Sequence, residues 1–381
     1  MDVSRYLQKI SLRCWIALTI AVLCGILFFG LRPKDFSFSN HVEWITKQPG
    51  IRFNRYGIAY TVPIKALSKT NDAYTNGFSI EIALKPESYH EEGFNVILAL
   101  HDGIDGEQLI VGQWRSWFII MNGDDYDHRR RTKRITIKPD EAPPKTRYVT
   151  ITTGKNGTRV YLDGRIVRTD RDLTLRIPEE GNTRLLLGNS VYGKSSWKGD
   201  IYGLALYPYP FTIKDAAIHF NKWIKDGSFR FAEKYNPLFL YVFDEGGGHR
   251  ALDHGSGNFD LEIPSKMKIL NKKFLSFTWN RTHFDPNFIR DIMINFAGFI
   301  PLGFFLSATF ATSGGSLEKH AALATVVLCF FVSLIIEILQ AWVPSRSSDG
   351  LDLVLNTLGG CLGVTGYILL NRKQKRSEIM E

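Results

Sequence analysis

The sequence predicts a mixed fold: an all-β jelly-roll sandwich joined to an α-helical membrane bundle of four transmembrane helices. Two observations support this prediction. Four nearly uninterrupted apolar stretches each approach the roughly 20 residues that cross a bilayer, and a polar region of short alternating runs separates the first from the second. The stretches are Cys14 to Leu31, Ile292 to Ala311, Ala321 to Val343 and Leu351 to Leu370. The mean hydropathy of -0.10 hides this division, because it averages a polar middle with apolar ends.

The first apolar stretch is interpreted as an uncleaved anchor, because it begins late and ends in FFGLRPKD without a small-x-small cleavage site. With this anchor, the predicted domain organisation of the chain has five parts. It consists of a cytoplasmic N-terminus at 1–13, a transmembrane helix at 14–31, an extracytoplasmic domain with a C-terminal extension at 40–275, a three-helix membrane domain at 285–371 and a basic cytoplasmic tail at 372–381.

The net charge of +9 is explained by topology rather than by nucleic-acid binding, since much of it lies beside the membrane ends. Basic residues precede the first span and follow the last: Arg5, Lys9, Arg13, Arg372, Lys373, Lys375 and Arg376. The positive-inside rule therefore places both termini in the cytoplasm and the middle region outside. Arg32 and Lys34, just outside the first span, run against this, but long loops translocate regardless of their charge.

The four cysteines all fall within predicted spans: Cys14, Cys24, Cys329 and Cys361. None lies in the exported region, where an oxidising compartment would form disulfides. The Cys-x-x-Cys spacing of metal and redox sites is absent. The exported domain must therefore depend on its own hydrophobic core.

Between residues 40 and 275 the sequence consists of short runs of alternating apolar and polar residues, which predicts an antiparallel sandwich. Asn156-Gly157 and Asp163-Gly164 are tight-turn dipeptides between such runs. One helix is expected, over TIKDAAIHFNKWIKDG, with Thr212 as its N-cap and Gly227 just past its end.

Three of these segments together resemble the laminin-G-like or concanavalin A-like jelly rolls. They are GFSIEIALKP, RVYLDGRIV and LLLGNSVYGKSSWKGDIYGLALYPYPFT, the last with a helix after it. The resemblance covers roughly 180 residues, and LYVFDEGGGHRALDHGSGNFDLEIP looks like the extension often seen beside such domains. It implies a domain that binds a glycan or an envelope protein ligand.

Glycan binding is favoured over hydrolysis, because retaining glycanases of this fold need two carboxylates on one strand face and no Glu-x-Asp-x-x-Glu run is present. Trp114, Trp117, Tyr126 and Trp197 are candidates for a sugar-stacking surface. Aromatic residues on alternating strands also belong to cores, so the core alternative stays open for each of them.

Three polar loops are considered as ion sites. HDGIDGE offers Asp102, Asp105 and Glu107 as oxygen ligands without the spacing of a defined calcium loop, and NGDDYDHRRRTKR is interpreted as a solvated loop with anionic-polymer binding as the alternative. FDEGGGHRALDH lacks the strand, Lys-Ser/Thr and helix of a phosphate loop. We do not assign its histidines, His249 and His254, to a metal.

Polar residues recur near the outer ends of the last three spans. With the predicted topology, the second span begins outside, the third ends outside and the fourth begins outside, so these residues share one depth in the membrane. The set is Asp291, Asn295, Glu337, Gln340, Arg346, Asp349, Asp352 and Asn356. Charged groups within a span are costly and usually face the bundle and mark function. The alternative is that they only join helices by hydrogen bonds.

The segments DIMINFAGFIPLGF and EILQAWVPSRSSDGLDLVLNTLGGCLG are similar to the VanZ-like family, named for teicoplanin resistance and found in bacterial membranes. The polar residues above follow the family's order and spacing, as do Pro301, Gly303 and Gly360. The resemblance covers about the last 95 residues. It implies a site for lipid-linked or glycan-bearing ligands near the cell envelope.

The leading hypothesis is a multi-pass protein of the bacterial inner membrane whose exported domain binds a glycan. Its polar site recognises a lipid-linked or phosphate-bearing molecule, with Arg346 gripping phosphate. Asn295, Gln340, Asp349 and Asn356 would complete the ligand contacts. A divalent cation, Ca or Mg, is left open as a cofactor, and no residue is assigned to it.

The rival hypothesis is a membrane hydrolase or transferase acting on a lipid-linked glycan. Glu337 or Asp352 would be its general base, with Asp291 as a further catalytic candidate. Lipid or ion translocation is the third alternative. The ligand and the oligomeric state are not determined by the sequence.

Overall fold

The computed structural model describes residues 10–32, 37–64, 76–91, 93–103, 108–123, 132–139, 143–178, 183–270, 274–275, 286–343, 346 and 348–380. The chain divides into two compact units. Met1–Asp35 with Lys272–Glu381 forms the helical unit, called here the bundle, and Phe36–Asn271 forms the β unit, called here the sandwich.

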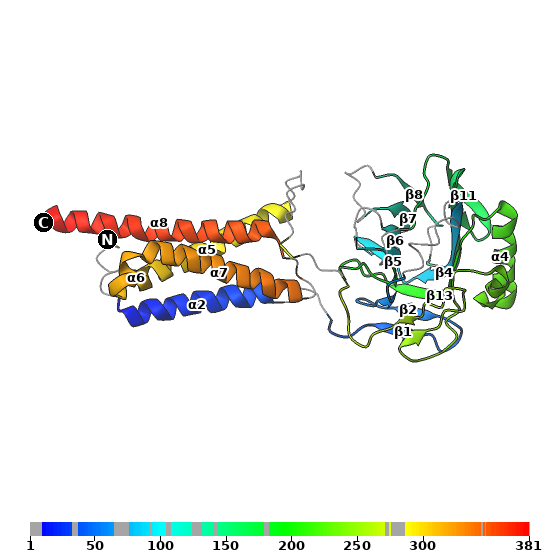
Figure 1. The fold of residues 1–381 in the computed structure, drawn as a ribbon, viewed down its shortest axis with the longest axis horizontal. Coiled ribbons are helices and arrows are strands. Elements are labelled where there is room, and N and C mark those ends of the chain that lie inside the picture. The colour runs from blue at the N-terminus through cyan, green and yellow to red at the C-terminus, as the bar shows by residue number, and fades with distance from the viewer. Residues whose placement is uncertain are drawn as a thin grey trace. The chain divides into compact units, whose positions relative to one another are not determined.

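The bundle contains α2 (Leu12–Leu31), α5 (Pro286–Thr312), α6 (Gly315–Lys319), α7 (Ala321–Trp342) and α8 (Gly350–Met380). The sandwich contains β1 (Val42–Trp44), β2 (Ile51–Phe53), β3 (Ala59–Thr61), β4 (Gly77–Pro86), β5 (Phe94–His101), β6 (Leu109–Trp114), β7 (Trp117–Asn122), β8 (Arg134–Ile137), β9 (Arg147–Gly154), β10 (Gly157–Leu162), β11 (Arg165–Asp170), β12 (Arg184–Leu187), β13 (Gly199–Tyr207), α4 (Ile213–Asp226), the 3-10 helix η2 (Phe229–Tyr235), β14 (Phe239–Tyr241), β15 (Arg250–Ala251) and β16 (Leu261–Glu262). Figure 1 shows these elements along the chain.

Two antiparallel sheets build the sandwich and confirm the predicted jelly-roll class. One sheet has the order β1-β2-β13-β4-β9-β10-β11, with β14 also paired to β13. The other has the order β15-β16-β3-β12-β5-β6-β7-β8. Strands distant in sequence are neighbours in both, as when β13 lies between β2 and β4.

Alternate residues of the strands face the space between the sheets and form the main core, as the period of two requires. In β9, Val149 and Ile151 enter this core, while Tyr148 faces the opposite side of its sheet. A second cluster on that outer side packs against α4 and η2, with Tyr148 stacked on Phe229 at a centroid distance of 5.4 Å. The sandwich is therefore stabilised by apolar layers on both faces of this sheet.

The expected helix is α4, and its ends are as predicted. The Thr212 side chain accepts from the Asp215 backbone N–H, while the Asp215 carboxylate accepts from the Thr212 N–H, which is a capping box. Gly227 ends the helix with a φ of 62°, a left-handed conformation that glycine adopts without strain. On its buried side, His219 Nδ1 lies 2.8 Å from Glu81 Oε2 of β4.

One of the two predicted turns is confirmed and the other is displaced by one residue. Asp163 and Gly164 form the β10–β11 turn with φ values of 53° and 74°. The β9–β10 turn consists of Lys155 and Asn156, because Gly157 already pairs with Gly154 and begins β10. Residue 157 still needs glycine, since its φ is 82°.

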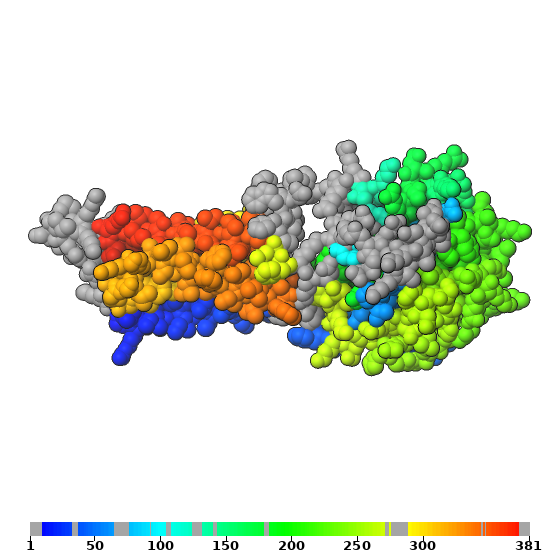
Figure 2. All heavy atoms as spheres, viewed as in Figure 1, coloured from blue at the N-terminus to red at the C-terminus, as the bar shows by residue number. Residues whose placement is uncertain are grey.

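Within the described residues, four helices are long and apolar enough to cross a membrane. They are α2, the Ile289–Thr312 part of α5, α7 and the Gly350–Arg372 part of α8, which agree with the predicted spans. Pro301 lies inside α5 without ending it. Helix α5 contacts α2, α7 and α8, and the visible surface of the bundle shows α8, α7 and α2 as neighbouring ridges (Figure 2).

Candidate binding cavity in the bundle

A cavity of about 670 Å³ lies within the bundle, between the C-terminal ends of α2 and α7 and the N-terminal ends of α5 and α8. All eight polar residues that the sequence predicts at one depth line it: Asp291, Asn295, Glu337, Gln340, Arg346, Asp349, Asp352 and Asn356. Their proposed roles remain predictions. Helix α2 also contributes to the wall, which the sequence did not indicate.

Close packing of α5 on α8 brings the two N-terminal ends together. A methyl group at Gly303 would collide with the backbone of Gly360, and one at Gly359 would collide with the carbonyl oxygen of Phe296. Only residues without a side chain permit this approach.

Arg346 and Gln340 attach the end of α2 to the cavity wall. The Arg346 side chain donates to the backbone carbonyls of Phe29 at 2.8 Å and Arg32 at 3.3 Å, and Gln340 Nε2 donates to the carbonyl of Gly30 at 2.8 Å. The last carbonyls of a helix have no partner within the helix and carry partial negative charge. Arg346 is thus a helix cap, and the predicted phosphate grip must be reassessed because two of its N–H groups already donate to backbone.

Glu337 is buried at 1 % exposure and is tied to the start of α8. Its Oε2 atom accepts from the Asp349 backbone N–H at 2.9 Å, and Asp349 Oδ1 in turn accepts from the Leu351 N–H at 2.9 Å. Asp349 therefore caps α8, as aspartate at a helix start commonly does. The two carboxylates are held by backbone donors, and a lost contact would disturb the loop between α7 and α8.

Asn356 lines the cavity and carries an unsatisfied acceptor. Its side chain is 4 % exposed, and Nδ2 donates to Ser333 Oγ at 2.9 Å. Its Oδ1 atom is buried and has no hydrogen-bond partner among the described residues. An amide oxygen in this state normally finds a donor, so a donor from a bound molecule or water is expected there. Asp291, in contrast, is 60 % exposed at its side chain, at the cavity rim.

The cavity lining is rich in acceptors and negative charge. Four carboxylates and a single guanidinium line it, together with two asparagines and a glutamine. Apolar side chains complete the wall on the side of α2 and α5: Val22, Ile26, Phe29, Ile292, Ile294 and Phe299. The cavity is therefore suited to an amphiphile whose polar part donates hydrogen bonds.

The aromatic candidates of the sandwich separate into two groups. Trp114 and Trp117 are half-buried and face each other across the β6–β7 turn. A cation lies over each ring, Arg115 at 5.2 Å and Lys138 at 5.9 Å from the centroids. The prediction that Trp197 belongs to a sugar-stacking surface is wrong. Its side chain is 1 % exposed and its Nε1 donates to Gln113 Oε1 in the core, so no sugar can stack on it.

Several predicted polar positions fall on residues outside the described ranges, namely Asp105, Glu107, Tyr126, Arg129, Arg130 and Arg131. Asp102, the remaining member of the proposed calcium loop, is 8 % exposed. A further arrangement does not follow from the sequence pattern. Asp244 and Glu245 lie beside His254, which the sequence analysis does not assign to a metal.

Comparison with known families agrees with both resemblances. Residues 250–371 match the family model VanZ/LLP1, and residues 63–217 match the concanavalin A-like lectin/glucanases superfamily. The chain joins a concanavalin A-like region to a VanZ-like region. The VanZ-like match includes the whole cavity except its α2 wall, and it begins at β15 within the sandwich. The family match and the apolar helices make this chain a membrane protein with several spans.

No curated protein matches the chain. Among solved structures, it is similar to the binding domain of a botulinum neurotoxin in complex with rat synaptotagmin II, with 14 % identity and a TM-score of 0.36 over 48 % of this chain and 45 % of the other. A putative carbohydrate binding protein from Bacteroides ovatus has 10 % identity and a TM-score of 0.41 over 58 % of this chain and 61 % of the other. The chain thus spans less than half of the neurotoxin chain it matches, and at these scores neither likeness carries an argument.

Proposed function

We propose that this VanZ-like protein is a bacterial envelope protein whose cavity binds the sugar-bearing head of a lipid-linked glycan. The concanavalin A-like sandwich binds a glycan outside the membrane. The eight polar residues that line one cavity carry the proposal, and the buried Asn356 Oδ1 atom, which has no partner among the described residues, supports it. The sandwich lies outside and both termini lie in the cytoplasm, as the distribution of basic residues favours.

The lining of the cavity supports an amphiphilic ligand. Polar groups come from α5, from the end of α7, and from α8 and the segment that leads into it, whereas the lining residues of α2 in the described part of the chain are apolar side chains and glycines. An amphiphile that stands in the membrane places its chain against apolar wall and its head beside polar groups. A fully soluble ligand would leave the apolar wall facing water.

The charge balance supports a head that donates hydrogen bonds. Four carboxylates repel a phosphate, and the single guanidinium already donates to the carbonyls at the end of α2. Sugar hydroxyls donate to carboxylate and amide oxygens without bringing negative charge. Sugar recognition is therefore favoured over the phosphate grip by Arg346 that the sequence suggested. A lipid phosphate would lie nearer the rim.

The test compares two probes on the detergent-purified full chain. One is a short-chain polyprenyl phosphate that carries N-acetylglucosamine, and the other is the same polyprenyl phosphate without sugar. Binding of the sugar-bearing probe should be stronger and should fall about tenfold in Asn356→Leu, because a buried hydrogen bond is lost. Thr357→Val is the control, since this hydroxyl donates to the Leu353 carbonyl and does not line the cavity. Equal binding of both probes would contradict the proposal.

The second candidate is an enzyme with Glu337 as the base, and one observation favours it. A carboxylate that is 1 % exposed yet lines a cavity is placed as a general base would be. Glu337→Gln keeps the shape and the acceptor for the Asp349 N–H but removes the charge. An enzyme would lose turnover and keep its ligand, whereas a binding site would lose affinity for the sugar-bearing probe. The control is turnover of the sugar-bearing probe by the wild-type protein, which must be measurable before its loss in Glu337→Gln can be interpreted.

Glycan binding by the sandwich is expected at Trp114 and Trp117. The pair lies at the ends of β6 and β7 beside their turn, and the cations at the rings favour acidic sugars. On an array of neutral and uronate-containing glycans, the full chain should bind acidic ones. The double variant Trp114→Ala/Trp117→Ala should lose this signal. Trp342→Ala, which removes an 80 % exposed tryptophan of the bundle, should retain it. Retention by the double variant would exclude this surface.

A further inference from the structure

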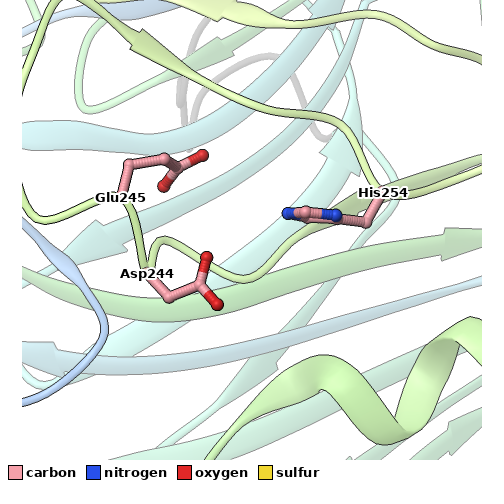
Figure 3. Close-up of side chains that lie close together, drawn as sticks. All are labelled: Asp244, Glu245 and His254. Carbon is pink, nitrogen blue, oxygen red and sulfur yellow. The ribbon is translucent and has the colours of Figure 1, made fainter.

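Three side chains of types that commonly bind metals lie close together in the sandwich. They belong neither to the cavity of the bundle nor to the Trp114 and Trp117 pair. Asp244 and Glu245 follow β14, and His254 follows β15. One ligand atom from each lies within 4.8 Å of the other two. Figure 3 shows the His254 ring directed edge-on toward the two carboxylates.

Two atoms of this cluster have no hydrogen-bond partner. Glu245 Oε2 and His254 Nε2 are both buried, and neither meets a donor or acceptor within the described part of the chain. Leaving such atoms unsatisfied costs free energy, and each one calls for an explanation such as an ion that the structure does not contain. A single metal cation would satisfy both the carboxylate oxygen and the imidazole nitrogen.

The surrounding contacts hold the three side chains in place. Glu245 Oε1 accepts from the Leu252 backbone N–H at 2.5 Å, and the backbone N–H of His254 donates to the Leu240 carbonyl at 2.8 Å. Arg230 donates twice to Asp244 Oδ2, at 2.6 and 3.0 Å, and leaves Oδ1 available. Metal ligands are commonly oriented by such outer contacts. Each residue therefore keeps one free ligand atom on a supported side chain.

We propose that Asp244, Glu245 and His254 bind a divalent transition-metal ion, with zinc as the best fit. One imidazole and two carboxylates suit zinc, whereas calcium takes six to eight oxygen ligands and no imidazole. Donors on a zinc ion lie about 2.0–2.2 Å from it, so any two of them are at most roughly 4.4 Å apart. The ligand atoms lie within 4.8 Å of one another, so shifts of a few tenths of an ångström would bring them to this spacing. Water completes the coordination.

The ion joins the segment after β14 to the segment after β15. These segments otherwise associate through single hydrogen bonds, such as the one from the Leu252 N–H. A bound ion stabilises the folded sandwich because the unfolded chain has no preformed site. The proposed role of the ion is to fix the geometry of these two loops.

The experiment uses the full chain in detergent, purified with a tag that contains no histidine. After chelator treatment and dialysis against zinc, elemental analysis should give one zinc per chain, and the melting temperature should rise. Both effects should disappear in His254→Ala and in Glu245→Gln. His249→Ala is the matched control, because His249 is an exposed histidine of the same segment outside the cluster, and it should retain the zinc.

A second measurement does not depend on whether the variants fold. X-ray absorption at the zinc edge of the wild-type protein should show one imidazole nitrogen among oxygen ligands. Zinc bound at one equivalent without imidazole scattering would overturn the proposal, as would unchanged binding in folded His254→Ala. Calcium stabilisation that persists in His254→Ala would overturn it as well. Loss of zinc in His249→Ala with retention in His254→Ala would assign the ion elsewhere.

Discussion

At the scale of the residue, Asp253 organises the segment between β14 and β16. Its Oδ1 atom accepts from the backbone N–H groups of Leu240 and Gly255, and its Oδ2 atom accepts from that of Phe259, each at 2.8 Å. Burial raises the pKa of the Asp253 carboxyl from its ordinary value of 3.8, although these three donors oppose the rise. The side chain thus takes part in a network that also positions its neighbour His254.

We predict that Asp253→Ala lowers the free energy of unfolding by about 2 to 4 kcal/mol, because three backbone donors lose their acceptor. Denaturant unfolding of the detergent-purified chain, followed by tryptophan fluorescence, measures it. Asp172→Ala is the control, since Asp172 is exposed and its change should stay within about 0.5 kcal/mol. Equal effects of the two substitutions would contradict the role of Asp253.

The raised pKa of Asp253 also predicts how the contribution of this carboxyl to the stability of the fold changes with pH. A carboxyl whose pKa is higher in the folded state binds its proton more tightly there, so its contribution to stability is complete below pH 3.8. That contribution declines as the pH rises through the folded-state pKa. In the same unfolding experiment, this decline should be present in the wild type and absent in Asp253→Ala.

At the scale of the element, the bundle depends on direct backbone contact between α5 and α8. A methyl group at Gly363 would collide with the carbonyl oxygen of Ile300, and Gly303 and Gly360 meet in the same way. Three residues further along α8, Gly366 has space, since its nearest neighbour is the Phe304 ring at 3.9 Å. Two glycines of one helix therefore differ in function although they have the same helix propensity.

We predict that Gly363→Ala destabilises the bundle by about 1 to 3 kcal/mol, which is the usual cost of overpacking. Gly366→Ala should be neutral or stabilising by up to about 1 kcal/mol, because alanine favours helix and meets no clash. Reversible unfolding in mixed micelles, followed by circular dichroism, compares the two variants. Destabilisation of both to the same extent would mean that contact with α5 is not the cause.

At the scale of the whole molecule, membrane topology determines on which side of the membrane the sandwich and the cavity of the bundle lie. Both termini are proposed to lie in the cytoplasm, so the short helix α6 should also face the cytoplasm and the sandwich should face outward. The cavity then lies toward the outer surface, because the C-terminal ends of α2 and α7 form it. A sugar-bearing lipid head would be accessible from that side.

We predict that Lys234→Cys in η2 is labelled by an impermeant maleimide in intact cells, whereas Lys319→Cys in α6 is labelled only after the membrane is permeabilised. Both positions are exposed. Cys14, Cys24, Cys329 and Cys361 are first replaced by alanine, and this background without added cysteine is the control. Labelling of Lys319→Cys in intact cells would reverse the topology.

The sequence by itself was sufficient for the elements whose determinants are local. Apolar runs of bilayer length mark the four spans, Thr212 and Gly227 mark the ends of α4, and Asp163-Gly164 marks a turn. Topology then placed the polar residues of three spans at one depth, and they line one cavity. This worked because a helix advances by a constant rise, so sequence position gives depth directly.

Tertiary structure decided which partner each polar group takes. Arg346 caps α2, more than 300 residues earlier in the chain, and Trp197 enters the core through Gln113. His254 approaches Asp244 and Glu245 only because two loops of the sandwich come together. A local pattern determines how a segment folds. The partner of a side chain depends instead on distant segments, whose packing is the net result of many small free-energy contributions. For that reason the spans and the depth of the polar residues were predictable from the sequence. The hydrogen-bond partners of the Arg346 guanidinium and the meeting of Asp244, Glu245 and His254 were not.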